Sequence, residues 1–400
     1  MSSRFDVALA AATERLADPA ATCPPGPEGA RWPTLDSQLG IALCYAELGH
    51  FEPELRPVAH RYLAAANAAL SGTGRHTLAA GVPALAFAAS AAAQHEGEYA
   101  ALLAGLDTAV FRIVRVLLDE EHDRLAAGAM AWDSTRFDLV AGLTGLGRYL
   151  LRRCLVSAEA EALLREILEY YRLLLRPITE RRLPGWWVAC APDPGAPPGS
   201  GHANLGMAHG IPGPLALLAL TWRHGVCVPG HGEATETIVE FLRAWSGIDE
   251  HGRYWPAALD LADYTEGPAE LPRSRTAWCY GAPGVARAVQ LAGLAANRPD
   301  WLALARQAMR ELPEPGPETG LCHGTAGLLH LAVRMRADDP ACALGVAADR
   351  LAERTAATLT HDGQQDPGLL TGTAGAALAL HTYRNGAPPP SGWDGVLLIG

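Results

Sequence analysis

A short glycine pattern recurs along the chain and constrains its fold more than any other feature. The pattern is Gly-x-x-Gly, a strongly apolar stretch follows each copy, and successive copies begin 43 to 71 residues apart. About 40 residues accommodate one helical hairpin, so this spacing predicts helical repeats with extra loops in the longer intervals. Five copies are complete (142–145, 210–213, 281–284, 324–327 and 372–375), and two upstream relatives are imperfect (37–40 and 81–84).

The stretches after the glycines are apolar on nearly every side, as in residues 41–48 (IALCYAEL). Helices of this kind must be buried, whereas the amphipathic segments between them, such as 158–175 and 343–359, suit an outer layer. Runs with the period of a strand are scarce. Seven buried helices alternating with seven amphipathic ones predict an all-α fold, a closed α/α toroid of about fourteen helices. Glycines at the starts of the inner helices would let backbones approach closely near the barrel axis.

An open helical solenoid is the alternative to a closed ring. An open array needs a polar cap at each end, but the last stretch, 376–383 (AALALHTY), is still apolar, so we favour closure. We therefore expect a single toroid domain over residues 1–400, with loop insertions near 178–205 and 246–275.

Composition and charge exclude several classes of protein. The 400 residues are 49% hydrophobic and 19% charged, without charge blocks, which excludes disorder over most of the chain. The apolar runs are too short for a transmembrane segment, and the N-terminus lacks the pattern of a secretion signal, so we expect a cytoplasmic location. The net charge of −11 comes with no cluster of Lys and Arg among aromatic residues, so no nucleic-acid partner is expected.

Metal-binding and titratable side chains precede the first glycine in three of the elements. They are His209, Cys279 and the pair Cys322-His323. If the repeats superpose around an axis, these residues gather at one end of the barrel. Cys279, Cys322 and His323 would then offer three soft ligands and leave a fourth coordination position open, which is typical of catalytic zinc. Without this clustering, His209 would be interpreted as a packed histidine, and the other buried cysteines are interpreted as core residues.

These motifs resemble those of the lanthionine synthetase C-like cyclases, which close thioether rings in lantibiotics. The resemblance covers most of the chain and agrees with the toroid. It rests on the glycine elements and on four stretches: 206–213 (GMAHGIPG), 274–281 (SRTAWCYG), 322–324 (CHG) and the tail at 393–398.

The resemblance implies a role for each motif residue. It implies that Cys279, Cys322 and His323 bind one zinc ion, and that His209 is an acid/base residue. Asp138 matches a functional aspartate, although Phe137 precedes it where the family usually has tyrosine, and Arg275 matches a functional arginine. Taken alone, Asp138 would be a helix N-cap and Arg275 part of a surface salt bridge. Trp278 and Tyr280, which flank the first zinc cysteine, are weaker candidates for substrate binding.

The implied reaction adds a cysteine thiol of a dehydrated precursor peptide to a dehydroalanine or dehydrobutyrine. A free thiol is only a few per cent thiolate at neutral pH, and coordination to zinc would deprotonate it. The addition generates an enolate that needs a proton, and a histidine can either take up the thiol proton or supply the proton that the enolate needs. We expect His209 to fill this role, with Asp138 orienting it and Arg275 holding Asp138 or the enolate oxygen.

Other activities stay open at this point. Glutathione addition to dehydrated residues, or prenyl transfer to a cysteine, would use the same zinc ligands, but both add mass whereas ring closure does not. A carboxylate-driven glycosidase needs two facing acids, which do not recur in the glycine elements. A catalytically silent peptide-binding scaffold would have lost a ligand or His209.

The sequence shows no embedded kinase or dehydratase segment, so we expect a stand-alone cyclase. It leaves open a complex with a dehydratase and an exporter, through which the chain would associate peripherally with a membrane.

Overall fold

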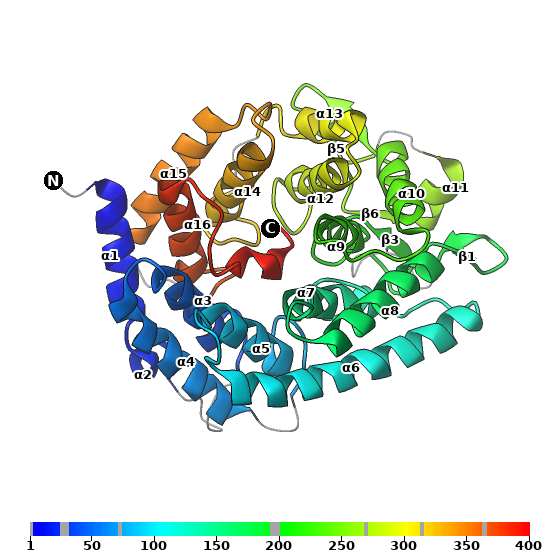
Figure 1. The fold of residues 1–400 in the computed structure, drawn as a ribbon. Coiled ribbons are helices and arrows are strands. Elements are labelled where there is room, and N and C mark those ends of the chain that lie inside the picture. Colours follow the sequence, from blue (N-terminus) through cyan, green and yellow to red (C-terminus); the bar gives the residue numbers. More distant parts are fainter. Residues whose placement is uncertain are drawn as a thin grey trace. The chain divides into compact units, whose positions relative to one another are not determined.

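The computed structural model describes residues 3–24, 32–70, 74–192, 201–267, 271–312, 316–361 and 366–400. Most of these residues are helical (Figure 1). The chain divides into two compact units. Unit 1 comprises Met1–Ala109, Glu314–Val396 and Gly400, and unit 2 comprises Val110–Pro313 and Leu397–Ile399. None of the helices in the described ranges is long and apolar enough to cross a membrane.

Seven buried helices follow the seven glycine elements, as predicted. In α3, for example, all 11 residues are buried, as expected for a stretch that is apolar on every side. The seven helices are α3 (Gln38–Leu48), α5 (Gly81–Ala92), α7 (Leu143–Arg153), α9 (Pro212–Arg223), α12 (Ala282–Ala295), α14 (Thr325–Asp338) and α16 (Thr373–Asn385).

Amphipathic helices lie between the buried ones in the sequence, also as predicted. In α8, the buried positions recur every three or four residues, and Ser157 caps the first turn by accepting from the Ala160 N–H. The group comprises α1 (Arg4–Leu16), α4 (Arg56–Ala69), α6 (Ala100–Ala126), α8 (Ala158–Leu174), α10 (His231–Ala244), α13 (Pro299–Ala308) and α15 (Gly345–Leu359). Two shorter helices are α2 (Pro19–Thr22) and α11 (Leu261–Glu266).

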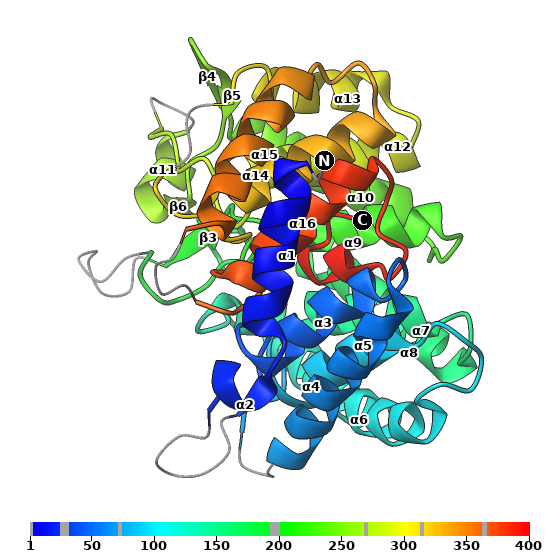
Figure 2. The same ribbon diagram turned by 90° about the vertical axis from the view of Figure 1, so that its left-hand side faces the viewer.

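In unit 1, the buried helices contact one another in the order α14, α16, α3, α5 (Figures 1 and 2). Helix α4 covers α3 and α5, while α15 covers α14 and α16. Helix α1 packs on α15 and α16, and its N-terminus is a capping box in which Ser3 and Asp6 exchange hydrogen bonds.

In unit 2, α9 contacts both α7 and α12. Helix α8 covers α7, α10 contacts α8 and α9, and α13 covers α12. Three antiparallel two-stranded sheets occur in the segments predicted as loop insertions: β1 (Pro177–Ile178) with β2 (Leu183–Pro184), β3 (His202–Asn204) with β6 (Ala258–Asp260), and β4 (Gly247–Asp249) with β5 (Gly252–Tyr254). Within those insertions, residues 193–200 and 268–270 lie outside the described residues. The single domain and the closure of the helices into a ring stay predictions.

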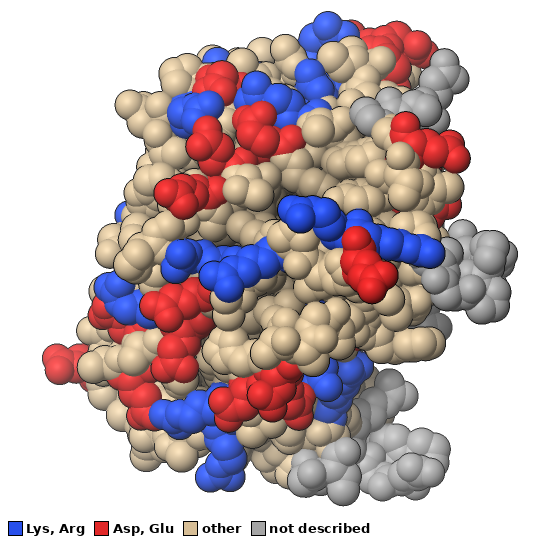
Figure 3. Space-filling model, turned by 90° about the vertical axis from the view of Figure 1, so that its right-hand side faces the viewer, with Lys and Arg blue, Asp and Glu red and all other residues tan. Residues whose placement is uncertain are grey.

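The surface carries charges of both signs. On the face drawn in Figure 3, basic and acidic side chains are interspersed. In unit 2, for example, Arg298 at the start of α13 pairs with both Glu236 and Asp300.

The glycine elements require glycine because the backbone at these positions lies against the loop that precedes each helix, with no room for a Cβ atom. A Cβ built on Gly281, where φ is +103°, would lie 1.7 Å from the Arg275 carbonyl oxygen, and one on Gly284 would lie 2.0 Å from that of Trp278. Both partners lie six residues earlier in the chain, and the same relation recurs at Gly210, Gly213, Gly324, Gly327, Gly372 and Gly375. We expected the glycines to let neighbouring backbones approach closely near the barrel axis. At these positions the close approach is between the start of each helix and the loop that precedes it in the chain.

Replacing Gly284 by alanine is expected to lower the free energy of unfolding by about 1–3 kcal/mol, because the added methyl group would overlap a backbone carbonyl that cannot turn away. The matched control is Gly105→Ala in α6, where an added Cβ meets nothing within 4 Å. That change should raise stability slightly, since alanine is the better helix former. Urea unfolding of both variants checks the prediction, and equal stabilities would contradict it.

Candidate functional site

Backbone hydrogen bonds join the loops that precede the buried helices within each unit. In unit 2, the Leu139 N–H donates to the Ala208 carbonyl (3.2 Å), and the Ala208 N–H donates to that of Cys279 (3.3 Å). Each unit therefore brings the loops of successive repeats side by side, as superposed repeats would. The corresponding bonds in unit 1 run from Leu35 to Ala79 (2.9 Å), from Leu369 to Leu35 (3.0 Å) and from Cys322 to Leu370 (2.8 Å).

Asp138 and His209 form a hydrogen-bonded pair in these loops of unit 2. The His209 Nδ1–H donates to Asp138 Oδ2 at 2.7 Å. The Asp138 side chain is fully buried, whereas the imidazole is 38% exposed. Asp138 Oδ1 accepts from the backbone N–H groups of Ala141 (2.7 Å) and Gly142 (3.0 Å), just before α7. Asp138 thus holds the turn that precedes α7 and also orients the histidine, which leaves Nε2 of His209 for other partners.

The Asp138 contact also sets the protonation of His209. Burial lowers the pKa of His209, but the hydrogen bond to Asp138 and the negative charge of that carboxylate outweigh burial, so the net pKa is raised above its ordinary value. A larger fraction of His209 therefore carries a proton at neutral pH, as a proton donor requires.

The two aromatic residues beside Cys279 have different surroundings. Trp278 is buried, and its indole N–H donates to the Leu397 carbonyl at 3.0 Å. Tyr280 is half-buried, and its ring centroid lies 6.3 Å from that of His209. The substrate-binding role expected of both residues stays a prediction.

Two further polar residues, Arg275 and Asn204, lie in or next to the loop that carries Cys279. The Arg275 side chain is exposed, and among the described contacts it makes no hydrogen bond to Asp138. Asn204, at the end of β3, was not singled out from the sequence. Its Nδ2–H donates to the Tyr280 hydroxyl (2.9 Å), and its Oδ1 accepts from the Gly206 N–H (2.9 Å). The only sequence signal for Asn204 is its position six residues before a glycine of the repeat.

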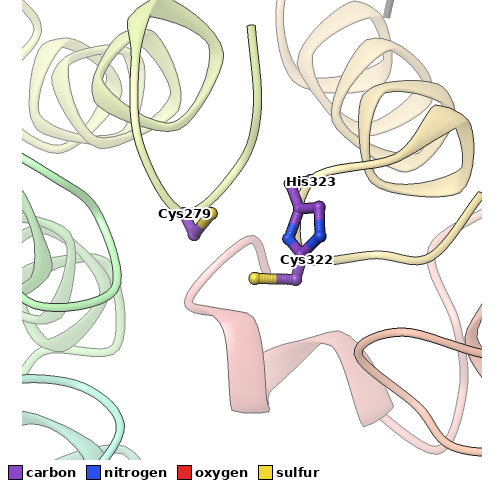
Figure 4. Close-up of side chains that lie close together, drawn as sticks. All are labelled: Cys279, Cys322 and His323. Atoms are coloured by element: carbon purple, nitrogen blue, oxygen red, sulfur yellow. The ribbon is translucent and has the colours of Figure 1, made fainter. Parts of the chain in front are cut away.

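Three potential metal ligands lie close together (Figure 4). The Sγ atoms of Cys279 and Cys322 and a ring nitrogen of His323 all lie within 4.8 Å of one another. Cys279 is buried and the other two are half-buried. Among the residues that the structure describes, no other group of three such side chains is found. Two sulfurs and one imidazole are a donor set that suits zinc, and three protein ligands leave one coordination position for another ligand.

The comparisons with known proteins identify the family. The model of the lanthionine synthetase C-like proteins matches residues 36–398. The chain belongs to the lanthionine synthetase C-like family. A solved structure named nisin cyclase is similar, with a TM-score of 0.77 and 20% sequence identity over 99% of this chain and 96% of that one. A search of curated proteins finds no match. These findings confirm the resemblance seen in the motifs, and the shared fold confirms the all-α class.

Proposed function

We propose that this member of the lanthionine synthetase C-like family is a zinc-dependent lanthipeptide cyclase. It would add cysteine thiols of a dehydrated precursor peptide to dehydroalanine or dehydrobutyrine in the same peptide, which forms lanthionine or methyllanthionine rings. The observation that carries the proposal is that Asp138 orients His209 and that the loop of His209 is hydrogen-bonded to the loop of Cys279. It combines a proton donor with a soft metal-ligand set, the two groups that thiol addition needs.

Cys279, Cys322 and His323 are the residues that would hold the zinc ion. Bound there, zinc would supply a Lewis acid that binds a thiol and lowers its pKa. The proposal is supported by the close approach of the three ligand atoms and by their chemistry.

The proton balance defines the role of His209. Addition of the sulfur to the β-carbon forms the C–S bond and shifts the C=C electron pair toward the carbonyl, which generates an enolate. The α-carbon then takes up one proton, which replaces the proton lost by the thiol, so the peptide mass does not change. His209 is proposed to deliver this proton, because its raised pKa favours the protonated form and Asp138 binds Nδ1, so that Nε2 would be the proton donor.

The remaining residues have supporting roles in the proposal. The Arg275 guanidinium offers several N–H donors to an anion, and its exposure makes it available to the enolate oxygen. Tyr280 would contact the substrate beside His209.

The direct test is incubation of the zinc-loaded protein with a dehydrated precursor peptide, followed by thiol alkylation and mass spectrometry. Ring closure predicts fewer alkylated thiols at unchanged peptide mass. Glutathione or prenyl transfer would instead add mass. If the number of free thiols stays at its value without protein, the cyclase proposal is wrong.

Replacing Asp138 by asparagine is expected to slow ring closure by roughly 10- to 100-fold, as loss of an orienting partner commonly does. The substitution also removes the charge that raises the pKa of His209. If protonated His209 is the active form, the rate falls as pH rises through this pKa, so the fall should move to lower pH. Rates measured across the neutral range test both effects. The control Ser157→Ala removes the N-cap of α8 and should leave the pH profile unchanged. If Asp138→Asn also leaves the profile unchanged, the pairing of Asp138 with His209 does not set the active protonation state.

A further inference from the structure

The loop that carries Cys279 has little regular structure of its own. Residues 271–281 form neither helix nor strand, so tertiary contacts must hold the cysteine in place. One contact is the hydrogen bond from Ala208 to the Cys279 carbonyl, and another is the packing of Gly284 against the Trp278 carbonyl. A third is the hydrogen bond from the Trp278 indole to Leu397.

Leu397 belongs to a tail segment that is buried throughout. Leu397, Leu398 and Ile399 are each 0% exposed. Arg287, on the helix that follows the Cys279 loop, is likewise 0% exposed. It donates through Nε (2.8 Å) and Nη2 (2.5 Å) to the Ile399 carbonyl. A buried guanidinium is destabilising unless it is paired, so these bonds hold the tail firmly against α12.

The hydrogen bonds of Arg287 and of Trp278 both hold the tail segment, one to α12 and the other to the Cys279 loop. Arg287 fixes the tail to α12, and the tail carbonyl of Leu397 fixes Trp278, the residue next to Cys279. Ligand loops that are fixed in the unbound protein bind more tightly, because less ordering is needed on binding.

We propose that the tail segment Leu397–Ile399 is a positioning element that acts through Trp278 to hold Cys279 ready for its metal. The inference rests on the proposed metal centre. It gives Trp278 a supporting role for the loop that carries Cys279, and it makes the segment Leu397–Ile399 a determinant of zinc affinity.

The test measures zinc affinity of the protein alone, by competition with a chelating dye, so that no peptide substrate is needed. Trp278→Phe keeps most of the buried ring but removes the indole N–H. It is expected to weaken zinc binding about tenfold, the lower range for loss of a group that orients a ligand. The matched control is Trp255→Phe in the same unit: Trp255 is also fully buried, and its indole donates to the Leu242 carbonyl at 2.7 Å. Trp255→Phe should lower the stability measured in urea about as much as Trp278→Phe does, because each loses one buried hydrogen bond. Its zinc affinity should fall by less than about twofold.

Deletion of residues 397–400 provides a second variant and a double-mutant cycle. The deletion should weaken zinc binding as much as Trp278→Phe does, and the two changes together should cost no more than either alone. The inference is overturned if Trp278→Phe weakens zinc binding no more than Trp255→Phe, or if the two losses multiply. If the deletion variant does not fold, the comparison of the two tryptophan variants still decides. Absence of zinc binding by the unmodified protein would instead overturn the proposed function.

Discussion

Replacing Cys279 by alanine is expected to abolish both zinc binding and ring closure. The change leaves two protein ligands of the proposed three, and an ion held by two ligands is lost to solvent. The expected loss of affinity exceeds the roughly 100-fold cost of removing a group that only orients a ligand. Zinc content after desalting, together with mass spectrometry of a dehydrated precursor, measures both effects.

Cys44→Ala is the matched control for this experiment. Cys44 is also buried, and burial raises the pKa of its thiol to about 12, so it is an inert core residue in α3. Its replacement should cost about 1 kcal/mol of stability, as removal of a small buried group does, and should leave zinc and activity in place. A Cys279→Ala protein that still holds one zinc ion and closes rings would show that the ligand assignment is wrong.

Replacing His209 by alanine is expected to leave zinc bound but to slow ring closure by about 10²- to 10⁴-fold. The side chain is not among the three clustered ligands, so the metal should stay. What is lost is the proton donor whose pKa Asp138 raises. Rates of thiol consumption, corrected for the reaction without protein, together with zinc content, separate the two properties.

His224→Ala controls for the loss of a histidine as such. His224 is exposed at the C-terminus of α9, where its Nδ1–H donates to the Leu220 carbonyl at 2.8 Å. Its variant should close rings at the normal rate. If His209→Ala does the same, another group supplies the proton and the acid/base assignment fails.

The helical part of the fold could be predicted because its signals are local and strong. Helix α3 is apolar on every side, and α8 alternates buried and exposed faces, so their burial follows from hydrophobicity alone. The short strands could not be predicted in this way. Strand β3 has only 3 residues, all buried, so no alternation marks it, and it exists because β6 pairs with it from 56 residues further along the chain.

The clustering of the three possible metal ligands could be predicted from their motifs, whereas the roles of the site residues stay predictions. The motif positions of Cys279, Cys322 and His323 led to the cluster that the structure contains. The two contacts of Asp138 were not foreseen, because the sequence suggested either a helix N-cap or a histidine partner, whereas the side chain binds both His209 and the turn before α7. The support from Leu397 left no sequence signal, since it contributes only a backbone carbonyl, which every residue has. Such contacts appear only when the chain is folded.

The measurement that tests the central claim most directly is zinc X-ray absorption spectroscopy of the loaded protein, with and without a cysteine-containing peptide. Two thiolates and one imidazole with an open position predict two sulfur neighbours at about 2.3 Å in the protein alone, and a third when the peptide thiol is added. A sulfur count that stays the same after the peptide is added, or four protein ligands from the start, would contradict the account.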